Sequence, residues 1–219
     1  MTAADLDASA PASRRSAPVA RISHAALRQN ASRLALPEGA LVGMPGDAYG
    51  HGLVQVAQTL TGMGLAIADA DIASAHAEAL LGVGPPGFRP VMRLSGTVLG
   101  TKRLRTGEGV SYGYTHRAAA DTRIALVVGG YAQGIVRALG NRASVSIAGE
   151  RHAIVGRVAM DVCVVDIGHA RVERGDEVVF FGDPDAGEPS VTEWVAETGL
   201  TATELITAVG LHAVREYAS

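Results

Sequence analysis

Apolar positions recur at helical or strand spacing through the first part of the chain. The helical interval is seen after a capping Ser23, over Leu53–Thr61 and over about Ile72–Leu81. Short continuous apolar runs at Ala40–Met44 and Leu65–Ala68 predict two buried strands. Strand, helix, strand, helix within ~40 residues is the unit of a parallel α/β sheet. We therefore expect a βα domain over residues 19–88.

After Pro90 the pattern changes to short β-branched segments separated by turns. The predicted strands are Val91–Leu99, Thr122–Gly129, Ser144–Ile147, Ile154–Val158, Val162–Ile167 and Glu177–Phe181, followed by helices near Val191–Thr198 and Thr203–Val209. The chain is therefore expected to be mixed α/β and α+β, with a mostly β domain over residues 89–219.

Two stretches lack this periodicity. Residues 1–18 are rich in Ala, Ser and Pro and predict a disordered tail. Residues 82–87 match the letters GxGxxG, but Pro85 and Pro86 lack the N–H groups that cradle a pyrophosphate. The run also follows a helix instead of a strand, so we interpret it as a linker between the domains.

Composition excludes several classes of protein. Lys+Arg of 19 against Asp+Glu of 22 leaves no cationic excess for nucleic acid, and no apolar run is long enough for a membrane span. The histidines show no metal-ligand spacing, so no metal site is predicted. The single Cys163 lies in an alternating apolar run and is interpreted as a buried strand residue, not a nucleophile. One cysteine allows no internal disulfide, which is consistent with a cytoplasmic location.

The most informative motif of the first domain is Gly46–Gly52, which reads GDAYGHG. It closely resembles the end of the first barrel strand in the alanine racemase family. In that family a lysine two places before the Asp forms the Schiff base to pyridoxal phosphate. Here that place holds Pro45, which has no side-chain amine and cannot form an aldimine. The only lysine of the chain, Lys102, lies in a different segment.

The second domain strengthens the resemblance over nearly all of residues 90–217. The ordered motifs that carry it are Gly109–Gly113 (GVSYG), Thr122–Ala125 (TRIA), Gly130–Gly134 (GYAQG) with Arg137 and Asn141, Val155–Asp161 (VGRVAMD) and Gly175–Val178 (GDEV). Residues 19–82 resemble only two of the eight strand-helix units of the family's TIM barrel. The resemblance implies a truncated barrel fragment followed by an alanine racemase type β domain.

The resemblance also implies site residues. Racemisation needs two bases that flank the substrate, which in the family are the Schiff-base lysine and a tyrosine from the partner subunit's β domain. Tyr131 stands at the place of that catalytic tyrosine, and Tyr49 at the place of a tyrosine that contacts the cofactor phosphate. Met160 lies in the segment whose backbone meets the substrate carboxylate. The family motif at Tyr131 is GYADG, so Gln133 replaces an acidic residue.

Each of these residues has a structural alternative. Tyr131 can be retained because its ring packs and its hydroxyl bonds within the β domain. Tyr49 and His51 can simply shape a Gly-rich turn. Lys102 can be a solvated strand residue instead of a relocated aldimine lysine.

By resemblance, the chain is an alanine racemase-like protein that interconverts L- and D-alanine with pyridoxal phosphate. Pro45 and the missing barrel units predict impaired catalysis and doubtful covalent binding of the cofactor. The alternative function is a non-catalytic dimerisation or regulatory module that pairs with itself or with a full-length racemase. A decayed gene product that folds but serves nothing is a third interpretation. Because the edges of a barrel fragment need covering, a homodimer is expected.

Overall fold

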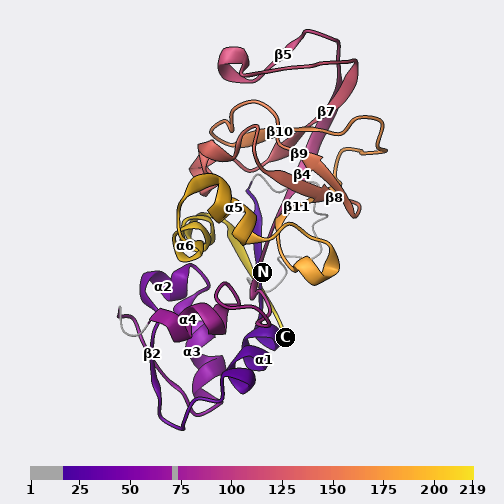
Figure 1. Ribbon diagram of the computed structural model, residues 1–219. Coiled ribbons are helices and arrows are strands. Elements are labelled where there is room, and N and C mark those ends of the chain that lie inside the picture. The colour runs from indigo at the N-terminus through magenta and orange to yellow at the C-terminus, as the bar shows by residue number, and fades with distance from the viewer. Residues whose placement is uncertain (1–16, 71–73) are drawn as a thin grey trace, which may run out of the picture.

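The computed structural model describes residues 17–70 and 74–219 (Figure 1). Its elements, in chain order, are β1 (Val19–Ser23), α1 (His24–Leu34), β2 (Leu41–Gly43), α2 (Pro45–Tyr49), α3 (Leu53–Thr61), β3 (Ala66–Ala68), α4 (Ser74–Leu81), β4 (Met92–Leu104), β5 (Gly109–Val110), β6 (His116–Arg117), β7 (Thr122–Val128), β8 (Ser144–Ile147), β9 (Glu150–Ala153), β10 (Val162–Asp166), β11 (Glu177–Phe181), α5 (Val191–Thr198), α6 (Ala202–His212) and β12 (Val214–Ala218). The predicted mixed α+β class is confirmed: the chain combines a partial barrel fragment with a large β sheet.

The predicted tail, residues 1–18, lies mostly outside the described residues. Of its last two residues, Pro18 is already part of the fold, because its carbonyl accepts a hydrogen bond from the N–H of Val214 at 2.9 Å. The helix expected from about Ile72 to Leu81 is described from Ser74, where α4 begins, and its first two positions, 72 and 73, lie outside the described residues.

The first part of the chain folds as an open βα layer. β2 and β3 pair in parallel, with Leu41 opposite Ala66 and Gly43 opposite Ala68. Helix α1 packs against α3 and α4, while α3 contacts β3 and α4 contacts β2 (Figure 1). This packing buries Leu27, Leu60 and Leu80 completely. These leucines belong to the helically spaced apolar positions of the sequence. The prediction of two parallel strands that do not close a barrel is confirmed.

The second part is built on a mostly antiparallel sheet of eight strands. Its main path runs β10-β7-β4-β11-β8-β9, and β1 and β12 extend it from β4. The predicted strands at residues 144–147 and 177–181 are confirmed at their bounds. Helices α5 and α6 lie between this sheet and the βα layer (Figure 1).

Strand β1 lies in the large sheet, although the sequence analysis assigned the chain from residue 19 to the first domain and predicted no strand there. It pairs antiparallel with β4, Val19 opposite Ser95, and parallel with β12, Val19 opposite Val214. Ala20 and Ile22 are fully buried and alternate with the exposed Arg21 and the half-buried Val19 and Ser23. The helix-capping signal of Ser23 hid this short alternation. The domain boundary at residues 88/89 stays a prediction. Strand β1 lies before that boundary in the sequence but pairs with β4, which lies after it.

The predicted strand at Ile154–Val158 is wrong. Only Ile154 forms a bridge, to Val165, and the chain then turns at Gly156, whose φ of 74° lies in the left-handed region. The N–H of Gly156 donates to the Oδ1 of Asn141 at 2.6 Å instead of to a neighbouring strand. The strand of this region is β9, which forms a hairpin with β8.

The core under α5 is aromatic. The ring of Trp194 meets Phe180 and Phe181 edge-on, with centroids 6.4 and 5.1 Å apart. Cys163 on β10 is fully buried, and burial raises the pKa of its thiol to about 12. The thiol therefore stays protonated, and the interpretation of Cys163 as a buried strand residue is confirmed.

Candidate functional site

Helix α6 holds both glycine-rich motifs that the sequence analysis singled out. A Cβ added at Gly50 would lie 2.9 Å from the Cα of Gly210, and one at Gly134 would lie 2.5 Å from the carbonyl oxygen of Ala208. Both turns thus rest directly on the backbone of α6, two residues apart along the helix. Only glycine allows this approach, because any side chain would overlap the helix.

The turn at residues 46–50 is left-handed throughout. Asp47, Ala48 and Tyr49 have φ between 50° and 59°, a conformation that costs non-glycine residues roughly 1–2 kcal/mol each. The Asp47 carboxylate fixes the turn, accepting a hydrogen bond from the N–H of Leu53 at 2.7 Å and an ion pair from Arg215. Burial by itself would raise the pKa of the Asp47 carboxyl, but the Leu53 N–H and Arg215 together hold that pKa below its usual value. Strain of this kind is kept at functional sites, where the surroundings impose it.

His51 is fully buried next to this turn. Its Nδ1 lies 3.0 Å from the carbonyl oxygen of Ala48 and 3.2 Å from that of Tyr49, which fits an Nδ1–H donor. Burial lowers the pKa of His51 to about 4, so the ring is neutral at physiological pH. Its Nε2 finds no partner among the described residues. His51 therefore holds the turn as a neutral donor and has no exposed surface for a ligand.

The residues around this turn do not fit covalently bound pyridoxal phosphate. Pro45 is the first residue of α2 and is separated from the end of β2 by Met44 alone, so the position of the family's lysine carries no amine. Lys102 is exposed on β4, opposite Ile124, and lines a separate groove with Arg103 and Arg123. The structural interpretation of Lys102 as a solvated strand residue is consistent with this position.

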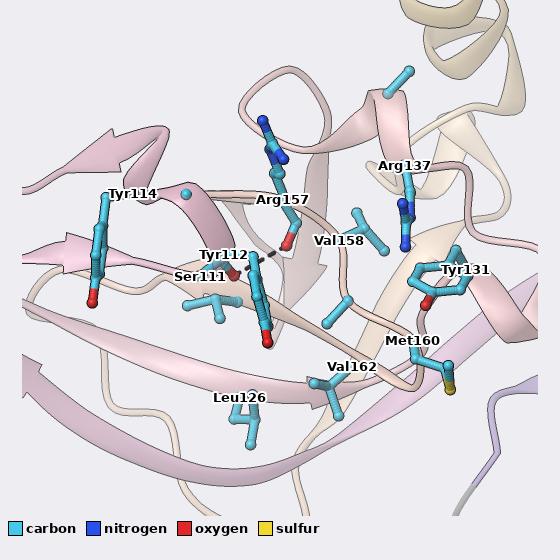
Figure 2. A pocket seen from close by; sticks show the side chains of 14 residues that line it. Ser111, Tyr112, Tyr114, Leu126, Tyr131, Arg137, Arg157, Val158, Met160 and Val162 are labelled. Carbon is cyan, nitrogen blue, oxygen red and sulfur yellow. Dashed lines mark hydrogen bonds between the residues drawn. The ribbon is translucent and has the colours of Figure 1, made fainter.

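A cleft of about 1220 Å³ opens on the β domain (Figure 2). The side chains and backbone that line it belong to Ser111, Tyr112, Gly113, Tyr114, Leu126, Tyr131, Arg137, Ala138, Arg157, Val158, Ala159, Met160, Val162 and Val164. Three of the five tyrosines of the chain are among them. The lining includes two arginines and no acidic residue, so the cleft is aromatic and cationic.

Tyr131 and Met160, predicted as catalytic and substrate-binding residues, meet in this cleft. The N–H of Tyr131 donates to the carbonyl of Ala159 at 2.9 Å, which places the 3-10 turn Tyr131–Gln133 beside Met160. Met160 is 54% exposed. The guanidinium of Arg137 lies 3.9 Å from the centroid of the Tyr131 ring and covers it (Figure 2). Tyr49, the predicted cofactor-binding residue, does not line the cleft.

Tyr112, Tyr114 and Arg157 also line the cleft, and the sequence analysis did not name them as site residues. The Ser111 hydroxyl donates to the Arg157 carbonyl at 3.0 Å and ties the tyrosine loop to the segment before Met160 (Figure 2). Tyr112 is 88% exposed. Tyr112 and Arg157 stand inside the matched motifs Gly109–Gly113 and Val155–Asp161, and this was the signal that could have identified them.

Comparison with known proteins decides the family. Residues 91–217, more than half of the chain, match the family model described as alanine racemase, C-terminal domain. The chain belongs to the alanine racemase family. The alanine racemase of Thermobifida fusca is 45% identical over 136 residues, which is 62% of this chain and 36% of the relative. That of Mycobacterium avium is 43% identical over 137 residues, 62% of this chain and 35% of the relative. The chain thus matches about a third of the length of these curated racemases.

Solved alanine racemases share the fold. The enzyme from Streptomyces lavendulae superimposes with a TM-score of 0.80 at 21% identity, covering 93% of this chain and 97% of that one. The alanine racemase from Bartonella henselae, solved with covalently bound pyridoxal phosphate, gives 0.70 at 16% identity and covers 92% of this chain and 99% of that one. At these identities the likeness concerns the fold alone.

Other classes of site are not supported. Over residues 17–70 and 74–219, no three His, Cys, Asp or Glu side chains gather as metal ligands. In the same residues, none of the helices has the length and apolar character needed to cross a bilayer.

Proposed function

We propose that this chain does not racemise alanine by itself and that its β domain docks on the barrel of a full-length alanine racemase. In the family, the counterpart of Tyr131 works in the partner subunit's barrel. The proposal rests on one contrast. The cleft of Tyr131 is complete within the β domain, whereas the place of the aldimine lysine holds Pro45.

The first half of the proposal follows from the absent amine. Pyridoxal phosphate supplies the electron sink for removal of the α-proton in the family, and it is held there through a lysine. Pro45 cannot attack the cofactor aldehyde, and Lys102 is exposed in another groove. An internal aldimine at the family position is therefore not formed.

The second half follows from the composition of the cleft. Tyr, Arg and Met are the side chains that dominate the central residues of protein interfaces. Tyr112, Tyr114, Arg157 and Met160 are all exposed around Tyr131. A barrel docked over them would remove apolar surface from water, which favours association by roughly 25 cal/mol per Å².

Self-association is the second candidate. The same cleft is available to a second copy, and the β2–β3 pair leaves strand edges that a second copy can cover. A second copy brings only two barrel strands to the cleft, whereas a full-length racemase brings a closed barrel. The racemase is therefore the partner that we propose. A cytoplasmic location, where such a partner would meet it, is part of the same proposal.

The absence of an internal aldimine is tested by spectroscopy. After incubation with pyridoxal phosphate and removal of the excess, the protein should show no visible absorbance band that borohydride removes. Such a band, lost on Lys102→Arg substitution, would instead locate an aldimine at Lys102 and contradict the proposal.

Docking is tested with two matched aspartate variants. Met160 in the cleft and Val54 on α3 are exposed to 54% and 63%. Met160→Asp should weaken binding to a full-length racemase at least about tenfold, since it places a charge within an apolar contact. Val54→Asp should leave binding within about twofold of the unchanged chain. Equal affinities for both variants in calorimetry would place the interface elsewhere.

A further inference from the structure

The turn that carries Tyr131 is fastened along its length to the segment that carries Met160. The N–H groups of Gly129, Tyr131 and Ala132 donate to the carbonyls of Asp161, Ala159 and Met160, each at 2.9 Å. A Cβ added at Gly130 would lie 2.2 Å from the Met160 carbonyl oxygen, so the two backbones touch. Both segments line the cleft. A shift of the Tyr131 turn would therefore also move the segment of Met160.

Gln133 closes this junction with its side chain. Its Oε1 accepts a hydrogen bond from the N–H of Gly130 at 2.9 Å, and its Nε2 donates to Oδ1 of Asp161 at 3.0 Å. A carboxamide is suited to both contacts because it carries one acceptor atom and one donor atom. An ionised carboxylate at residue 133 could accept from Gly130 but has no hydrogen to give to Asp161.

We propose that Gln133 is the positioning residue for Tyr131. Its carboxamide spans the start of the Tyr131 turn and the Asp161 carboxylate, and so keeps Tyr131 and Met160 in one register in the cleft. The acidic residue that the family motif has here would face Asp161 with a second negative charge. Gln133 therefore gives this chain a junction that does not depend on a proton shared between two carboxyl groups. The functional importance of that register rests on the docking function proposed above.

The test is a double-mutant cycle read by amide hydrogen exchange of the isolated chain. The Gly130 N–H reports the junction directly, because its acceptor is the Gln133 side chain. The Val98 N–H, bonded to the Asp176 carbonyl at 3.0 Å within the sheet, serves as control for global opening. Loss of one hydrogen bond and the charge repulsion should accelerate Gly130 exchange about tenfold in Gln133→Glu, with Val98 unchanged.

Rescue distinguishes a specific bridge from general packing. In Gln133→Glu combined with Asp161→Asn, the donor and acceptor roles are exchanged, and Gly130 exchange should return to within about threefold of the original rate. Asp161→Asn alone should stay within about threefold, because the Gln133 amide can donate to the Asn oxygen. Unchanged Gly130 exchange in Gln133→Glu, or no rescue in the double variant, would overturn the proposal. Because these measurements need no partner, failure of docking would leave their result intact.

Discussion

Two glycine-rich turns rest on the same helix and differ in the side chains that they present. The turn of Gly50 and the turn of Gly134 both touch the α6 backbone, at Gly210 and Ala208. The first has a left-handed backbone and an Asp47–Arg215 ion pair, and it carries Pro45 at the place that the resemblance assigns to a lysine. The second keeps Tyr131, the arginine that covers it and a complete cleft. The two turns therefore share a packing role and differ in the side chains that they present.

The turns can differ in this way because packing on α6 requires their glycines and does not require a lysine at residue 45 or the Tyr131 hydroxyl. Gly50 and Gly134 fill the space against the helix, and their replacement would move backbone. The contacts with α6 involve the two glycines and not residue 45, so a proline at residue 45 is compatible with this packing, whereas a side chain at either glycine is not.

The largest expected effect comes from adding a methyl group at either turn. Gly50→Ala and Gly134→Ala should each lower the free energy of unfolding by about 3 to 4 kcal/mol, because left-handed strain adds to backbone overlap. Gly199→Ala is the matched control, since Gly199 has φ of 72° and open space around its Cβ position. It should lose only about 1 kcal/mol. Equal losses for all three in urea denaturation would show that contact with α6 is not what these turns provide.

The second prediction concerns the first turn alone, where the buried His51 should make the free energy of unfolding depend on pH. The buried His51 has its pKa lowered to about 4, so the unfolded chain takes up its proton first as pH falls through 6.5. Its stabilising contribution is complete above that pH and is lost between pH 6.5 and 4, by about 3 kcal/mol. Urea denaturation across this range should show the fall, and His51→Gln should flatten it. The same slope in His51→Gln would assign the pH dependence to other groups.

A smaller effect is expected from the ion pair of the first turn. Asp47→Asn keeps an oxygen for the N–H of Leu53 but loses the charge that faces Arg215. Because the pair is partly exposed, the loss at pH 7 should be about 1 kcal/mol. The lowered pKa of Asp47 means that its contribution is present above pH 4 and disappears as pH falls below that value. The difference between the two proteins should therefore shrink as pH falls below 4, and a difference that stays constant there would show that the charge of Asp47 is not its source.

The smallest effect on stability is expected at Tyr131. Its hydroxyl makes no hydrogen bond within residues 17–70 and 74–219, and the ring of Tyr131→Phe can still lie under Arg137. Tyr131→Phe should therefore change the free energy of unfolding by less than about 0.5 kcal/mol. A larger loss would favour the structural role for Tyr131, with a hydroxyl bonded inside the β domain.

Much of the fold could be predicted from local pattern. The elements Leu53–Thr61, Ser144–Ile147 and Val191–Thr198 have the predicted bounds, because their apolar pattern is local. The strand at Val19–Ser23 was missed because its partners, β4 and β12, lie far away in the sequence. The error at Ile154–Val158 arose because an apolar run does not reveal the turn at Gly156.

The candidate site was predicted in its central residues but not in its walls. Tyr131 and Met160 were found from ordered motifs, and the structure brings them together. The cleft walls at Tyr112 and Arg157 depend on the Ser111 contact across 46 residues, which no local pattern encodes. The effect of Gln133 was left open by the sequence for the same reason, since its partner Asp161 is 28 residues away.

We propose that the chain supplies Tyr131 to another subunit while it forms no aldimine of its own. The most direct measurement is complementation of a full-length alanine racemase, such as that of Thermobifida fusca, in which the tyrosine equivalent to Tyr131 is replaced by phenylalanine. Added to this inactive racemase, the chain should restore interconversion of L- and D-alanine, and its Tyr131→Phe variant should not. No restoration by the unchanged chain in a complex verified by size-exclusion chromatography, or equal restoration by Tyr131→Phe, would contradict the account.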